Sequence, residues 1–194
     1  MSTGSANILT PNQRRWLNYL TVSTLLIGGF MLWLDDELRT KGARLGSVSL
    51  ELAGSNQAAK HVLNGWSSQQ RIIAAIGLGF DFVFIANYSV WLYLGCLWSA
   101  ERWLSGNANR ARQLQLAAWL AIGAGGFDVV ENFVLFDFIH SGGKSPAYPI
   151  AFWCATIKFV LLGIVLIGVG SGLLAGGAAE KKPTTVPVPV PVKK

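Results

Sequence analysis

Charged side chains are scarce in this sequence. Asp, Glu, Lys and Arg make up only 13% of its 194 residues, whereas they make up about 25% of a typical soluble domain. Hydrophobic residues make up 52%. This balance excludes an ordinary soluble domain and predicts an integral membrane protein with a single domain.

Histidine and cysteine are also rare, with two residues of each type. His61 and His140 lie in or beside expected loops, so we expect no haem and no His-ligated metal within the membrane. Cys96 and Cys154 do not form a CxxC pair, and the topology described below places them near opposite faces of the bilayer. We therefore expect two buried thiols and no disulfide.

The sequence lacks the motifs of common enzyme classes. It has no Gly-rich phosphate loop, GxSxG, HExxH or redox CxxC, so it indicates no particular reaction, and any cofactor stays unknown. The net charge of +6 does not indicate nucleic-acid binding, because the Lys and Arg residues flank apolar runs and do not cluster with aromatic residues.

Long apolar runs dominate the chain. A membrane-spanning helix needs about 20 mostly apolar residues, and four segments qualify: 15–34, 71–99, 113–138 and 148–175. The sequence therefore predicts an all-α, four-helix transmembrane bundle over residues 13–176. An N-terminal tail (1–12), an extracytoplasmic cap between the first two helices (35–70) and a Pro-rich tail (177–194) complete the organisation.

The ends of the first run carry local signals. Residues 10–13 match a capping box, with Pro11 at the first helical position. The run over 16–34 is too long for the apolar region of a signal peptide and lacks a small-residue cleavage site after it. We therefore expect a first membrane span and no cleavable signal peptide.

Basic residues are distributed unequally between the two sides of the predicted bundle. Nine lie on the side of the termini: Arg14, Arg15, Arg102, Arg110, Arg112, Lys181, Lys182, Lys193 and Lys194. Five lie on the other side: Arg39, Lys41, Arg44, Lys60 and Lys144. Cytoplasmic loops carry the excess of Lys and Arg, so we expect both termini in the cytoplasm and the chain in a cell inner membrane.

The connection over 35–70 is long for a structureless loop. Residues 47–52 alternate polar and apolar, which predicts a short strand or an extended interfacial segment. Ser55 is placed to cap a short helix over 56–64 that Gly65 closes. We expect this segment to fold over the outer mouth of the bundle.

In the C-terminal tail, the Val-Pro repeat favours extended polyproline II, as a solvated tail or a proline-motif ligand.

Ionisable residues inside the apolar runs are the main functional signal. A charge at the bilayer centre costs at least about 2.5–3.5 kcal/mol, so it must pair, line a watery cavity or have a function. With a rise of about 1.5 Å per residue, Asp81, Asp128 and Lys158 all lie about 15 Å inside the outer ends of their helices. We expect Lys158 to pair with Asp128 or Asp81.

Helical spacing puts further polar groups beside these charges. Glu131 and Asn132 share a face with Asp128, and Tyr88 shares a face with Asp81. In one interpretation, Lys158 neutralises one carboxylate, Asn132 and Tyr88 satisfy the rest, and the cluster only fixes helix register. In the other, three carboxylates and one ammonium leave an excess of two negative charges, which suits binding a cation or a basic ligand, relaying a proton or supplying a general acid.

Two resemblances support the architecture. Residues 47–54, with Asp81, Tyr88 and the Asp-x-x-Glu-Asn motif at 128–132, make the chain similar to a group of small, uncharacterised bacterial four-span membrane proteins. That resemblance covers about residues 15–175 and implies a bacterial inner membrane and four helices, but no activity. At the level of the fold, the chain also resembles EXPERA-domain proteins, including sterol isomerases, whose four-helix bundles bury carboxylates facing a lipid-like ligand.

We therefore predict a protein that binds or moves a small hydrophobic or cationic molecule. Its ligand-binding residues would be Asp81, Tyr88, Asp128, Glu131, Asn132 and Lys158, and no metal is expected. The alternatives are a membrane-embedded lipid-modifying enzyme with Glu131 or Asp128 as proton donor, and a structural or assembly subunit. The lipid bilayer is the expected partner, and a homo-oligomer is left open.

An apolar cavity that reaches the carboxylates would favour ligand binding or lipid chemistry, and a tightly packed cluster would favour the structural alternative.

Overall fold

The computed structural model describes residues 7–175 and is helical, with no strand among them. The helices are α1 (Pro11–Asp36), α2 (Ser47–Glu51), α3 (Asn56–Asn64), α4 (Ser68–Trp103), α5 (Ala108–His140) and α6 (Tyr148–Ala175). The Val-Pro tail and the first part of the predicted N-terminal tail lie outside the described residues.

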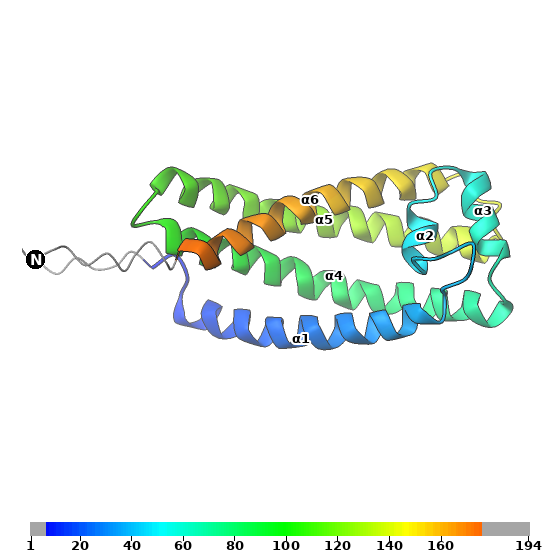
Figure 1. The fold of residues 1–194 in the computed structure, drawn as a ribbon, viewed down its shortest axis with the longest axis horizontal. Coiled ribbons are helices and arrows are strands. Elements are labelled where there is room, and N and C mark those ends of the chain that lie inside the picture. The colour runs from blue at the N-terminus through cyan, green and yellow to red at the C-terminus, as the bar shows by residue number, and fades with distance from the viewer. Residues whose placement is uncertain (1–6, 176–194) are drawn as a thin grey trace, which may run out of the picture.

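The four long helices form the predicted four-helix bundle. Each of α1, α4, α5 and α6 is long and apolar enough to cross a membrane, which supports a multi-pass membrane protein. They run side by side, the start of α1 and the end of α6 lie at one end of the molecule, and α2 and α3 gather at the other end (Figure 1). Helices α4, α5 and α6 pack against one another, whereas α1 packs mainly against α4.

Polar caps extend the helices beyond their apolar runs. Thr10 and Gln13 form the predicted capping box of α1. An equivalent box between Ser67 and Gln70 starts α4 before its apolar run, and Asn107 caps α5. These three helices are therefore longer than the predicted spans, because the capped polar turns at their ends continue the same hydrogen-bond ladder, whereas α6 has the predicted bounds, 148–175.

Small residues allow the close helix contacts. Ala118, Ala121 and Ala124 are fully buried on the inner face of α5. A Cβ added at Gly125 would overlap the Ser89 side chain of α4. In a membrane, where lipid is as apolar as a helix surface, this close backbone approach is a main source of helix association.

A polar seam joins α1 to α4. Ser23 Oγ donates to Asn87 Oδ1 at 2.7 Å, and Asn87 Nδ2 donates to Thr24 Oγ1 at 2.6 Å. Trp91 Nε1 donates to Thr21 Oγ1 at 2.9 Å. These bonds attach α1 to α4 near the middle of both helices, where no water competes for the polar groups.

The connection between α1 and α4 folds over one end of the bundle. The helix predicted over 56–64 is confirmed as α3, with Ser55 as its N-cap and Gly65 at its C-terminal end. The prediction of a strand or extended segment over 47–52 is wrong, because residues 47–51 form helix α2. Asp35 Oδ1 accepts a 2.7 Å hydrogen bond from the Ser47 amide and thereby holds the start of α2.

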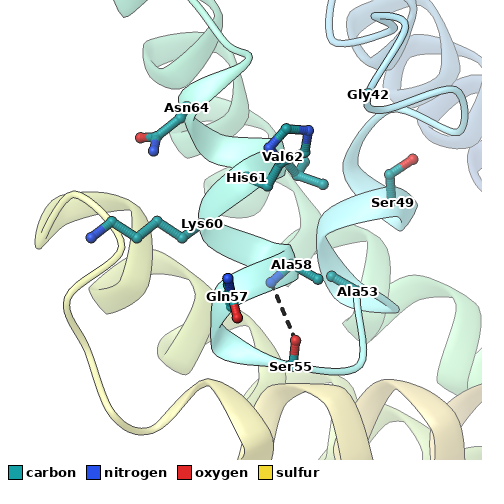
Figure 2. A pocket seen from close by; sticks show the side chains of 10 residues that line it. All are labelled: Gly42, Ser49, Ala53, Ser55, Gln57, Ala58, Lys60, His61, Val62 and Asn64. Atoms are coloured by element: carbon teal, nitrogen blue, oxygen red, sulfur yellow. Dashed lines mark hydrogen bonds between the residues drawn. The ribbon is translucent and has the colours of Figure 1, made fainter.

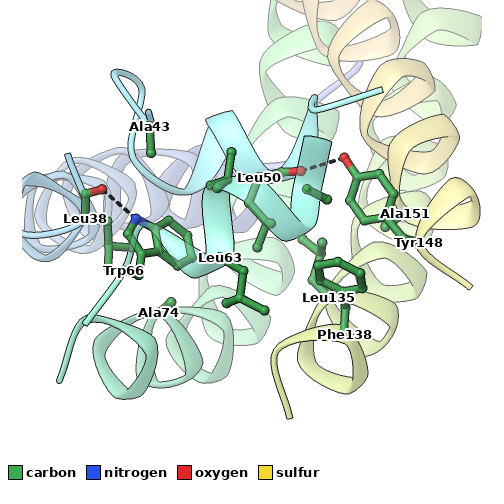
Figure 3. Packing of buried hydrophobic residues seen from close by; sticks show 12 residues of the cluster. Leu38, Ala43, Leu50, Leu63, Trp66, Ala74, Leu135, Phe138, Tyr148 and Ala151 are labelled. Carbon is green, nitrogen blue, oxygen red and sulfur yellow. Dashed lines mark hydrogen bonds between the residues drawn. The ribbon is translucent and has the colours of Figure 1, made fainter. Parts of the chain in front are cut away.

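This end of the molecule has its own apolar core (Figure 3). Leu50 and Leu63 from α2 and α3 pack with residues of the long helices, among them Phe138 and Tyr148. Tyr148 Oη donates to the Leu50 carbonyl at 2.7 Å, and Trp66 Nε1 donates to the Leu38 carbonyl at 2.9 Å (Figure 3). We call residues 37–67 the cap, and these contacts hold it against α4, α5 and α6.

Candidate functional site

Lys158 of α6 is the centre of a buried ionic cluster. Its side chain is 7% exposed, and its Nζ lies 2.7 Å from Asp128 Oδ1 and 2.8 Å from Glu131 Oε2. The predicted pairing of Lys158 with Asp128 is therefore confirmed. Asp81, the alternative partner, makes no ion pair with Lys158. Glu131 forms a second ion pair with Lys158, which was not predicted.

The third carboxylate at Lys158 comes from the cap. Glu51, the last residue of α2, places its Oε2 3.3 Å from Lys158 Nζ. Glu51 lies in the segment over 35–70 and is not among the site residues predicted from the sequence. The helical conformation of α2 buries Leu50 and turns the neighbouring Glu51 into the bundle, and Tyr148 fixes both through the Leu50 carbonyl.

Tyr88 and Asn132 connect the carboxylates of α4 and α5. Tyr88 Oη donates to Asp128 Oδ2 at 2.7 Å, so both oxygens of Asp128 accept hydrogen bonds. Asn132 Nδ2 donates to Asp81 Oδ2 at 2.7 Å. The structure thus brings all six sequence-predicted site residues together, although Asp81 has no cationic partner among the described residues.

Glu131 is the most deeply buried of the carboxylates. Its side chain is fully buried. Its Oε2 is close enough to Lys158 for an ion pair, yet neither of its oxygens makes a hydrogen bond within the described residues. Unpaired buried polar atoms are uncommon in proteins and call for a specific explanation.

The charge excess is larger than the sequence suggested. With Glu51 included, three carboxylates contact the Lys158 ammonium and Asp81 adds a fourth through Asn132, which leaves a formal excess of three negative charges when all are ionised. Taking charges out of water is expensive unless they are paired. A bound cation would neutralise part of this excess.

An apolar cavity of about 450 Å³ reaches the cluster. All four long helices and the cap contribute to its walls, with apolar side chains such as Met31, Phe84 and Leu162. Its polar wall includes Glu51, Tyr88, Asn132 and Lys158 together with Asp81 and Asp128. Glu131 does not line the cavity and lies behind this wall. A mostly apolar pocket with a few convergent polar groups is typical of small-molecule sites.

A second hollow, of about 680 Å³, lies on the outside of the cap (Figure 2). It is lined by Gly42, Ser49, Ala53, Ser55, Gln57, Ala58, Lys60, His61, Val62 and Asn64. None of the buried carboxylates reaches it. Within residues 7–175, no group of three or more His, Cys, Asp or Glu side chains is arranged to hold a metal ion.

The comparisons with known proteins add no relative. No family model, no curated protein and no solved structure matches the chain.

Proposed function

We propose that this protein binds, or moves, a small hydrophobic or cationic molecule inside the membrane. The observation that carries the proposal is the cavity of about 450 Å³ that ends at Asp81 and Asp128. Its volume lies within the range of about 300–1,000 Å³ of small-molecule pockets. Its apolar walls suit a hydrophobic body, and the carboxylate excess suits a positively charged or hydrogen-bond-donating group.

The same cavity argues against a purely structural role. A cluster that only fixes helix register should be closely packed, with every polar group satisfied by the protein itself. Here Asp81 and Asp128 form part of a cavity wall, and Asp81 has no cationic partner among the described residues. These features are expected where a ligand completes the site.

Lipid-modifying chemistry is the second candidate function. Asp128 lines the cavity and is hydrogen-bonded to both Tyr88 and Lys158, so a proton can move along this chain to a bound molecule. Asp128 is therefore a better candidate for the proton donor than Glu131, which lies outside the cavity wall.

We also propose a location in a bacterial inner membrane with both termini in the cytoplasm. Arg14 forms an ion pair with Glu101, and Arg102, Arg110 and Arg112 flank the turn between α4 and α5 at the same end of the bundle. These residues supply part of the basic excess that the positive-inside rule uses. In this orientation the cap faces the extracytoplasmic side.

Lipid-resolved mass spectrometry of the purified protein tests the binding proposal. The parent should carry a co-purifying small molecule in addition to bulk lipid. Gly28→Leu places a larger side chain at the cavity wall, and Gly29→Leu is the matched control, because Gly28 lines the cavity and Gly29 has open space around it.

The molecule should be lost from Gly28→Leu and retained by Gly29→Leu. Equal lipid profiles for the parent and both variants, with no enriched molecule, would contradict ligand binding in this cavity.

A further inference from the structure

The cavity opens sideways, between α1 and α6. Three of its lining residues are also exposed on the outside of the molecule: Leu32 of α1 is 67% exposed, and Phe159 and Leu166 of α6 are 39% and 51% exposed. The lining residues from the cap, α4 and α5 are all buried or half-buried. The residues that connect cavity and surface therefore lie on the two helices that do not pack closely on each other.

This opening lies at membrane depth. Phe159 and Leu166, which line the opening on α6, lie at least about 13 Å from each end of the helix at a rise of about 1.5 Å per residue. The surfaces on both sides of the opening are apolar, with Leu25 on α1 and Ile167 on α6 among the most exposed side chains. A molecule that enters here comes from the lipid phase.

Within the buried cluster, Asp81 is the carboxylate at the cavity wall that is free to meet a cation. Its only hydrogen bond within the described residues comes from Asn132, and no Lys, Arg or His forms an ion pair with it. The one ammonium nearby, Lys158, is already shared among three other carboxylates. An ammonium group on a ligand would supply the missing charge.

The same charges oppose anionic head groups. A phosphate close to Asp81 would also lie close to the Asp128 carboxylate on the same wall, and like charges at short range in a low-dielectric site repel strongly. A phospholipid head group is therefore a poor fit, even when it carries an amine.

We propose that the cavity binds a membrane-dissolved amphiphile with one ammonium group and no phosphate. The amphiphile enters between α1 and α6, its apolar body fills the cavity, and its ammonium lies against Asp81, which Asn132 orients. This inference rests on the proposed binding function and specifies the chemical class of the ligand and its route.

Photolabelling tests the route without any substitution. The full-length protein in phosphatidylcholine nanodiscs is irradiated with an apolar diazirine dissolved in the bilayer, and the labelled residues are mapped by mass spectrometry. Leu92 and Val165 are both buried, but only Leu92 lines the cavity. The apolar probe should label Leu92 clearly more than Val165, and a charged, water-soluble diazirine should label neither.

Equal labelling of Leu92 and Val165 by the apolar probe, or preferential labelling of Leu92 by the water-soluble probe, would overturn the lateral route. Either result leaves the binding proposal itself standing, because binding is measured independently.

Three probes of equal chain length test the ligand class: dodecylamine, dodecanol and dodecyl phosphate, each at the same mole fraction in the nanodiscs. Retention by the parent should be about tenfold higher for the amine than for the alcohol, because one charge-assisted hydrogen bond raises the affinity by about that factor. Asp81→Asn should remove this preference, and Asp137→Asn, an exposed change on α5, should keep it.

Equal retention of amine and alcohol, or preferential retention of the phosphate, would refute the amine assignment while still supporting an amphiphile-binding cavity. Retention of none of the three probes above the level of the Gly28→Leu variant would overturn the inference. Binding itself would then be decided by the co-purification experiment.

Discussion

Replacing Lys158 by Met should strongly destabilise the bundle. The Met side chain keeps much of the apolar stem of Lys158 but removes the ammonium that lies within 3.3 Å of three carboxylates. Asp128 would keep its hydrogen bond from Tyr88, whereas Glu51 and Glu131 would lose their only ion-pair partner in the described residues.

The size of the stability loss in Lys158→Met follows from the burial of the cluster. Breaking a buried ion pair by removing one partner costs about 3–5 kcal/mol, because an uncompensated charge stays in a low-dielectric site. Asp128→Asn in the same chain should recover only part of this loss. The Glu51 and Glu131 carboxylates stay without a cation, so the recovery is smaller than for an isolated pair.

Denaturant titration of the detergent-solubilised protein measures the change in the free energy of unfolding. Lys144→Met is the matched control, because Lys144 is exposed and surface substitutions usually change stability by less than about 0.5 kcal/mol. A Lys158→Met variant that is as stable as Lys144→Met would refute the buried cluster and would mean that Lys158 reaches the membrane interface by snorkelling.

Three further outcomes are expected. Tyr148→Phe removes the 2.7 Å hydrogen bond to the Leu50 carbonyl, which keeps the 3.4 Å bond from the Ala53 amide; the loss should cost about 0.5–1.5 kcal/mol, and proteases should then cleave 47–66 faster than in the parent, whereas unchanged cleavage would mean that this bond does not hold the cap. Gly46→Ala should lower the free energy of unfolding by more than about 1 kcal/mol, since Gly46 has a φ of 58° and its Cβ would overlap Asp35; equal denaturant midpoints would contradict this. An impermeant maleimide added to intact cells should label Gln57→Cys and not Gly106→Cys, and the opposite pattern would reverse the proposed orientation.

Most of the bundle could be predicted from the sequence, because apolar runs of about 20 residues have few alternatives to a spanning helix. The start of α1 was also predictable, since a capping box is a local signal. The clustering of Asp81, Asp128 and Lys158 followed from their equal depth, which needs only the rise per residue.

The cap was harder to predict because its conformation depends on contacts distant in sequence. Alternation over 47–52 favours a strand when it is considered alone. The helix α2 forms because Asp35 holds its first amide and Tyr148 binds its last turn. Glu51 reaches Lys158 only because α2 is helical and packs on the bundle. Its position in a loop of the sequence could therefore not indicate that it belongs to the site.

The cavity also could not be predicted from the sequence. A face pattern shows which residues point inward, but not whether the neighbouring helix closes the space between them. Here α1 packs on α4 through the Asn87 seam and leaves α6 uncovered. That offset produces the space beside Asp81.

A cryo-electron microscopy structure of the full-length protein in lipid nanodiscs would show directly whether the cavity holds a ligand. We expect an elongated density between α1 and α6, within the cavity and ending within hydrogen-bond distance of Asp81 or Asp128. A structure in which α1 packs directly on α6, so that side chains fill the cavity and seal the carboxylates from the bilayer, would contradict it.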